Sequence, residues 1–179
     1  MTPLAARGIL EAIYWKPAIR WHIARIHVLK PIRLERMPAS SPQSDRSHAN
    51  ASRLDTRSQI VLTDVAYVIE AHLTITSEAG PDDSPTKHVA MFNRRASVGR
   101  SFRSVTLGGA DCAAEFALVA GQRDLPRGES EPFGSDMDLG WLLHDIDYTC
   151  DDQPALFFRA RMRGGVIEVP SLDSPELAR

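Results

Sequence analysis

The sequence has few of the features that mark secreted, membrane or disulfide-rich proteins. It contains only two cysteines, Cys112 and Cys150, with no C-x-x-C pair and no zinc spacing, so we expect reduced thiols and a cytoplasmic location. The apolar runs are a few residues long, whereas a membrane-spanning helix needs ~20. The N-terminus lacks a signal-peptide pattern. The sequence therefore predicts neither a disulfide framework nor a contact with a membrane.

The common cofactor and nucleophile motifs are also missing. There is no G-x-x-x-x-G-K-[ST], G-x-G-x-x-G or G-x-S-x-G, and the six histidines show no H-E-x-x-H spacing, so we expect no cofactor and no metal site. Two acidic pairs, Asp136/Asp138 and Asp145/Asp147, are typical either of a divalent-metal nuclease or of solvated strand ends. We favour the second interpretation.

The charge is nearly balanced overall but unevenly distributed. The 179 residues are 43% hydrophobic and 25% charged, with a net charge of −2, which fits one core-forming domain, with or without a small appendage, and excludes a uniformly basic coat. Residues 1–36 hold seven Lys or Arg, residues 85–103 hold five and no acid, and residues 124–152 hold nine acids. We expect the two basic blocks either to converge on an anionic ligand such as RNA or to be solvated faces.

Periodicity and turn signals predict an α+β fold. The expected elements are a helix from Thr2 to before Pro17, a strand at 19–29, a loop at 37–58, a long strand at 60–76, a helix at 84–98, a strand at 114–120, a loop at 121–138 and antiparallel strands at 139–148, 156–162 and 166–169. This order matches a ferredoxin-like β-α-β-β-α-β unit without its first strand. We therefore expect a ferredoxin-like domain at 1–120 and a small C-terminal antiparallel β-sheet with a tail at 121–179.

Lys87-His88 is the strongest candidate for chemistry in the sequence. It lies in the first turn of the second predicted helix, where the helix N-terminus and cationic side chains attract phosphate. A histidine moves protons near neutral pH, and Tyr14, at the end of the first helix, could add a hydroxyl. RNA cleavage without a metal needs such a set, because a base must activate the 2′-OH, a cation must stabilise the phosphorane and an acid must protonate the 5′-oxygen. The alternative is a capping histidine and a packed tyrosine.

Several separate motifs together resemble one known family. The runs are ARGILEAIYWKP at 6–17, VLKPIR at 28–33, DVAY at 64–67, IEAH at 69–72, KHVAMFNRRA at 87–96 and DLGW at 138–141. In this order they resemble the CRISPR-associated Cas-five family of type I-C systems, whose fold is a ferredoxin-like domain with a small C-terminal sheet. The resemblance covers most of the chain outside 37–58 and 121–137.

The resemblance implies an RNA-processing function. Members of this subtype are metal-independent endoribonucleases that cut CRISPR repeat RNA, leave a 2′,3′-cyclic phosphate and hold the 5′ handle of the guide RNA beside the backbone and large subunits of the surveillance complex. The family's active-site Tyr, Lys and His fall on Tyr14, Lys87 and His88. We expect His88 to transfer the proton, Lys87 to stabilise the phosphorane and Tyr14 to position the 2′-OH.

The same resemblance leaves a non-catalytic alternative open. Relatives carry a first strand ahead of the first helix, so we expect Met1 to be either an internal methionine or the start of a truncated gene. The alternative is an inactive subunit that binds the RNA handle and supports assembly, and a third reading is a ferredoxin-like domain for another anion. In either RNA-binding case, the basic residues expected to contact RNA are Arg7, Lys16, Arg20, Arg94, Arg95 and Arg100.

Overall fold

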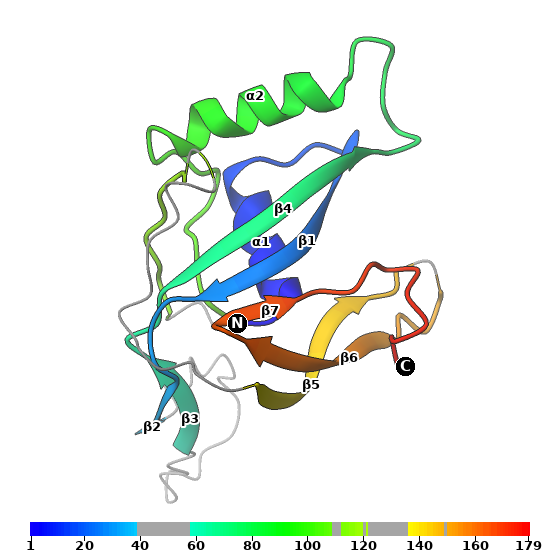
Figure 1. The fold of residues 1–179 in the computed structure, drawn as a ribbon. Helices are drawn as coiled ribbons and strands as arrows, with labels where there is room; N and C mark the ends of the chain where they lie inside the picture. The colour runs from blue at the N-terminus through cyan, green and yellow to red at the C-terminus, as the bar shows by residue number, and fades with distance from the viewer. Residues whose placement is uncertain (39–57, 109–111, 120, 122–135, 149) are drawn as a thin grey trace, which may run out of the picture.

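The described part of the chain contains two helices and seven strands. The computed structural model describes residues 1–38, 58–108, 112–119, 121, 136–148 and 150–179. The elements are α1 (Pro3–Ile13), β1 (Ile19–Val28), β2 (Arg33–Pro38), β3 (Ser58–Thr63), β4 (Tyr67–Ile75), α2 (Pro85–Ala96), β5 (Met137–Ile146), β6 (Ala155–Arg163) and β7 (Val166–Glu168). Five strands form one antiparallel sheet in the order β4-β1-β7-β6-β5, and β2 and β3 form a separate two-stranded ribbon (Figure 1).

The signals at the N-terminus start α1 as the sequence predicts. The hydroxyl of Thr2 accepts the amide of Ala5 at 3.2 Å, and Pro3 occupies the first turn. The helix ends at Tyr14, which has extended backbone angles, three residues before Pro17. Its buried side chains recur at helical spacing, so one face of α1 packs against β1 and β5.

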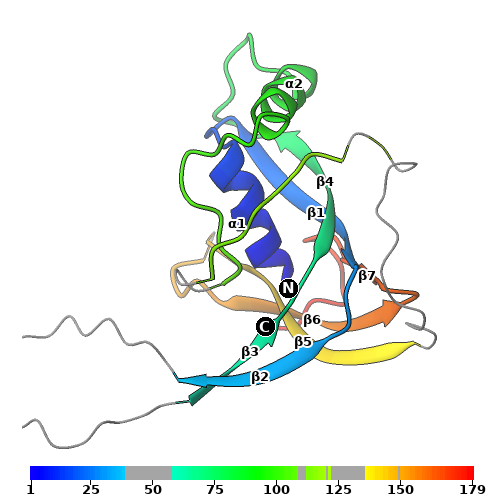
Figure 2. The same cartoon turned by 90° about the vertical axis from the view of Figure 1, so that its left-hand side faces the viewer.

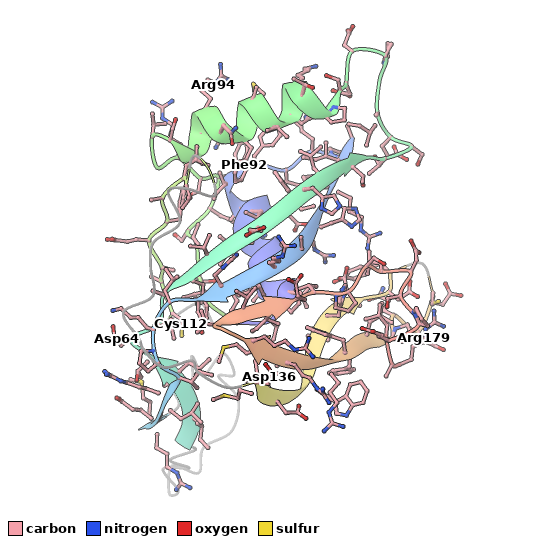
Figure 3. All side chains as sticks on the ribbon, viewed as in Figure 1. Asp64, Phe92, Arg94, Cys112, Asp136 and Arg179 are labelled. Carbon is pink, nitrogen blue, oxygen red and sulfur yellow. The ribbon has the colours of Figure 1, made fainter. Side chains whose placement is uncertain are left out.

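The core lies between the helices and the face of β1 and β4 that they cover. Ile19, Trp21 and Ile23 alternate toward the helices along β1, and the ring of Phe92 on α2 lies 4.8 Å from the ring of Trp21. Figure 2 shows α1 along one side of these strands, and Figure 3 shows Phe92 on the side of α2 that faces the sheet. This packing joins α1, α2 and β1 at one end of the sheet.

The prediction of one long strand at 60–76 is wrong, because two strands, β3 and β4, occupy this segment. Asp64 has a φ of 49°, a left-handed conformation that a continuous strand cannot contain. The chain changes direction there, and β3 pairs with β2 from Arg33↔Thr63 to Pro38↔Ser58. The sequence did not predict β2. The loop expected at 37–58 lies outside the described residues except for its ends, which belong to these strands.

The C-terminal strands are antiparallel, as predicted, but they do not form a sheet of their own. β7 pairs with the C-terminal part of β1 from Arg25↔Glu168 to His27↔Val166, and β6 and β5 follow on its other side. The backbone groups at the edge of β1 find their partners in β7, which removes a free edge from the centre of the molecule. The sheet is therefore continuous across the chain.

The strand expected at 114–120 is absent from its described residues, 114–119. The amide of Ala114 bonds to the carbonyl of Val105 at 2.9 Å, and no ladder follows. A groove of ≈ 610 Å³, lined mainly by apolar side chains, lies along this segment, α1 and the outer edge of β4. An extended segment becomes a strand only beside a partner edge, and across this groove it has none. Most of the loop expected at 121–138 lies outside the described residues.

Neither α1 nor α2, the two helices of the described residues, has the length and apolar character to cross a bilayer.

Candidate functional site

The end of α1 and the start of α2 bring Tyr14 and His88 into contact. The Tyr14 hydroxyl lies 2.8 Å from Nδ1 of His88, although 74 residues separate them in the sequence. Both residues are buried, with 3% and 2% of their surface exposed. Lys87 is the neighbour of His88 on the first turn of α2. The three residues expected from the sequence thus occupy one place, and their catalytic role stays a prediction.

Three hydrogen bonds fix the end of α1 where Tyr14 lies. The amide of Tyr14 bonds to the carbonyl of Leu10 at 2.8 Å, and its carbonyl accepts the indole N–H of Trp21 at 3.0 Å. Arg95 of α2 donates Nε–H to the carbonyl of Ile13 at 2.7 Å. Carbonyls at a helix end need partners from outside the helix, and these partners come from β1 and α2. The backbone at residues 13 and 14 is therefore held by bonds from α1, β1 and α2.

The N-cap of α2 orients Lys87 and His88. The hydroxyl of Ser84 accepts the amide of Lys87 at 3.3 Å, and its carbonyl accepts the amide of His88 at 3.1 Å. Adjacent helix residues point in different directions because the turn per residue is about 100°. The imidazole of His88 therefore points inward, while the side chain of Lys87 is 51% exposed and donates Nζ–H to the carbonyl of Asp82 at 3.1 Å.

Asp83 is a fourth member of the cluster that the sequence did not reveal. Its Oδ2 accepts the amide of Gly80 at 3.0 Å. Its Oδ1 lies 3.1 Å from Nε2 of His88 and 3.4 Å from Nζ of Lys87. The contact with Nε2 is close, but it does not have the geometry of a hydrogen bond. Its one sequence signal was an acid four residues before a lysine at a helix start, which is common on ordinary helices.

Burial and the local charges set the protonation of the cluster. Burial raises the pKa of Tyr14, so its phenol keeps its proton at neutral pH, and its hydroxyl shares a hydrogen bond with Nδ1 of His88. The Gly80 amide, followed by the ammonium of Lys87, holds the pKa of Asp83 below its ordinary value. The site at neutral pH thus contains a neutral phenol, an imidazole and an ionised carboxylate beside an ammonium.

The basic residues expected to contact RNA differ in how available they are. Arg94 lies on the outer side of α2, with Nη2 3.3 Å from Sδ of Met91 (Figure 3). Lys16 and Arg100 are exposed. Arg95, by contrast, stacks its guanidinium 3.8 Å above the ring of Phe102 besides bonding to α1, so it serves the packing of the helices.

Arg7 and Arg20 both pair with the carboxylate of Asp145, which is 3% exposed. Arg7 is largely buried, and Arg20, with an exposed side chain, lies 3.3 Å from Asp145. The other acids considered as metal ligands also pair with arginines: Asp136 with Arg163, Asp138 with Arg159 and Asp147 with Arg179. Among the described residues, no three His, Cys, Asp or Glu side chains lie close enough to share a metal ion.

Comparison with known proteins gives consistent matches over nearly the whole chain. The family described as CRISPR-associated protein (Cas5), subtype Cas5d, matches residues 1–170. A protein of Mannheimia succiniciproducens named CRISPR pre-crRNA endoribonuclease Cas5d is 42% identical over 196 residues, which cover 100% of this chain and 87% of that protein. A protein of the same name from Thermus thermophilus is 33% identical over 199 residues, covering 99% of this chain and 83% of that protein.

Solved structures show the same fold. A crystal structure of a CRISPR-associated protein superposes with a TM-score of 0.76 at 26% identity, covering 99% of this chain and 84% of the other. A functionally uncharacterized protein from Streptococcus mutans superposes with a TM-score of 0.74 at 24% identity, with the same coverage.

Proposed function

The chain belongs to the Cas5d family of CRISPR-associated proteins, and we propose that it is an endoribonuclease that cuts CRISPR repeat RNA and stays bound to the 5′ handle of its product. The observation that carries the proposal is the contact between Tyr14 and His88 beside Lys87. The names of the two curated relatives, both pre-crRNA endoribonucleases, support the substrate and the reaction.

The proposed reaction needs no metal ion. The 2′-oxygen of one nucleotide attacks the adjacent phosphorus, a new O–P bond forms and the bond to the 5′-oxygen breaks, which yields a 2′,3′-cyclic phosphate and a 5′-hydroxyl. The imidazole of His88 is buried and contacts the Tyr14 hydroxyl. In the proposed scheme the 2′-OH proton moves to the Tyr14 oxygen while the phenolic proton moves to Nδ1. The resulting imidazolium returns a proton along the same path to the departing 5′-oxygen.

Lys87 supplies the positive charge in this scheme. Its ammonium is exposed at the N-terminal turn of α2, where the helix dipole also favours an anion. A phosphate at this position gains charge as it becomes a phosphorane, and a cation placed for that state lowers the barrier. The exposed Lys16, Arg20, Arg94 and Arg100 extend the positive surface for the RNA backbone. For Arg7 and Arg95, RNA contact requires an exchange of their present partners.

The fold and the assembly are further parts of the proposal. The antiparallel pair β1–β4 with α1 and α2 on one face supports a ferredoxin-like arrangement for residues 1–120. The groove at the free edge of β4 lies where the first strand of that arrangement would pair. We propose residues 121–179 as a C-terminal subdomain, whose described strands β5, β6 and β7 continue the same sheet as β1. We place the protein in the cytoplasm, beside the backbone and large subunits of the type I-C surveillance complex. The alternative is an inactive handle-binding subunit.

A cleavage assay in EDTA tests the proposal. The protein, His88→Ala and the control His72→Ala are incubated with the host repeat hairpin RNA, and the products are separated on a denaturing gel. His72 is exposed on β4, outside the cluster. We expect one cut by the protein and by His72→Ala, and none by His88→Ala. Cleavage by His88→Ala at the wild-type rate would contradict the mechanism, and binding without cleavage by the protein would favour the inactive subunit.

A further inference from the structure

We propose that Asp83 is a positioning residue for cleavage, which sets the tautomer of His88 and holds Lys87 in place until RNA arrives. This inference rests on the proposed function and adds a residue outside the Tyr14, Lys87 and His88 set. Asp83 acts through these neighbours and contacts no reacting atom itself.

The turn before α2 fixes the carboxylate of Asp83. The amide of Gly80 donates to Oδ2 at 3.0 Å, and the amide of Asp83 donates back to the carbonyl of Gly80 at 3.1 Å. The side chain is 23% exposed. Because one oxygen is held by the backbone, the other oxygen, Oδ1, has a defined direction, and it faces His88 and Lys87. The geometry is thus built by the loop and does not depend on a freely rotating side chain.

Asp83 and Tyr14 lie at the two different nitrogens of the His88 ring. In the proposed tautomer the hydrogen is on Nε2, beside the carboxylate of Asp83, and Nδ1 accepts from the Tyr14 hydroxyl 2.8 Å away. The Nε2 atom is buried and has no hydrogen-bond partner among the described residues. The Oδ1 atom of Asp83, 3.1 Å away, is the negative charge next to it. A carboxylate beside the second nitrogen of a base favours the tautomer that has its hydrogen on that nitrogen.

Lys87 shares the same carboxylate oxygen. Its Nζ lies 3.4 Å from Oδ1, so Asp83 restrains the ammonium close to the turn. An RNA phosphate is a stronger partner for an exposed ammonium than a shared carboxylate oxygen is. When phosphate takes over Lys87, Oδ1 is left for Nε2 of His88 alone. Asp83 therefore links the binding of the substrate to the alignment of the base.

Asp83→Asn tests the inference, with Asp82→Asn as the matched control. Asp82 lies in the same turn, is exposed and uses only its backbone carbonyl in the cluster. We expect single-turnover cleavage of the repeat RNA to fall about 10- to 100-fold in Asp83→Asn and to stay at the wild-type rate in Asp82→Asn. Binding of an RNA with a 2′-deoxy nucleotide at the cut site should be unchanged in both. Asp83→Glu, which restores the carboxylate, should recover part of the rate.

A spectroscopic measurement separates positioning from a structural role. The ¹⁵N shifts of His88 should show hydrogen on Nε2 in the protein and a changed tautomer in Asp83→Asn. A wild-type rate in Asp83→Asn, or ¹⁵N shifts of His88 that do not change in Asp83→Asn, overturns the inference while the proposed function stands. If the protein itself does not cut, the proposed function fails and the ¹⁵N shifts alone decide the role of Asp83.

Discussion

At the scale of single residues, the site depends on where the helix turn places two neighbours. Lys87 and His88 are adjacent in the sequence, yet the ammonium is at the surface and the imidazole is buried against Tyr14. A cation that meets phosphate must remain hydrated until RNA binds, whereas a base works best where water does not compete. One helix turn thus carries both groups, and packing against the end of α1 buries the imidazole.

His22 gives a pH dependence that can be measured in the folding free energy. Burial, followed by the neighbouring His72 and Arg20, lowers the pKa of His22 below the ordinary histidine value of about 6.5. The unfolded state therefore binds the proton more readily than the folded state as the pH falls below 6.5, so this contribution to stability is present above that pH and lost below it. We expect His22→Gln to reduce the loss of stability between pH 7.5 and pH 5.5 in denaturant unfolding. An unchanged loss would contradict the assignment.

Sequence reasoning could find some residues of the site and not others. Helix-boundary signals and the family resemblance pointed to Tyr14, Lys87 and His88 because each lies in a recognisable local pattern. Asp83 was not predicted because its role depends on the turn at Gly80, which directs one carboxylate oxygen toward His88, five residues later. Arg95 was expected to contact RNA, but it donates to the carbonyl of Ile13, 82 residues away. No local sequence pattern predicts such a contact.

At the scale of elements, the N-cap of α2 connects helix stability to the site. The Ser84 hydroxyl accepts the amide of Lys87, so its loss leaves a backbone donor without a partner in the turn that carries Lys87 and His88. We expect Ser84→Ala to lower the free energy of unfolding by about 1 kcal/mol and to slow RNA cleavage. Ser84→Asp keeps a capping oxygen and should retain stability in the same denaturant titration. Equal stability of all three proteins would show that the cap contributes nothing.

The element boundaries were predictable where a local stop signal exists. Pro17 and Gly99 predicted the ends of α1 and α2 to within a few residues of their observed positions. The break at Asp64 was missed because Asp in a left-handed conformation leaves the apolar alternation on both sides intact. The segment at 114–119 has the pattern of a strand, but a strand also needs an edge to pair with, and this part of the chain faces a groove. Pairing is a tertiary property that the residues of one segment do not contain.

At the scale of the whole molecule, a buried charge cluster joins the two ends of the sequence. Asp145 of β5 pairs with Arg7 of α1 and with Arg20 of β1, and its Oδ1 accepts the amide of Ile146 at 2.7 Å. The helix α1 packs on both β1 and β5, and β7 connects the same two parts of the sheet. Residues 1–28 and 137–168 therefore stabilise one another.

Removal of Asp145 should destabilise the whole molecule in a single step. Asp145→Ala leaves the largely buried guanidinium of Arg7 without that carboxylate, and the loss of one partner of a buried pair costs about 3 kcal/mol. Asp138→Ala is the matched control on β5, because its pair with Arg159 is exposed and should contribute little. Since α1 contacts both halves of the sheet, calorimetry should show one transition that moves to lower temperature in Asp145→Ala and stays in place in Asp138→Ala. Two separate transitions would show instead that residues 1–120 and 121–179 unfold as independent units, with Asp145 stabilising only their contact.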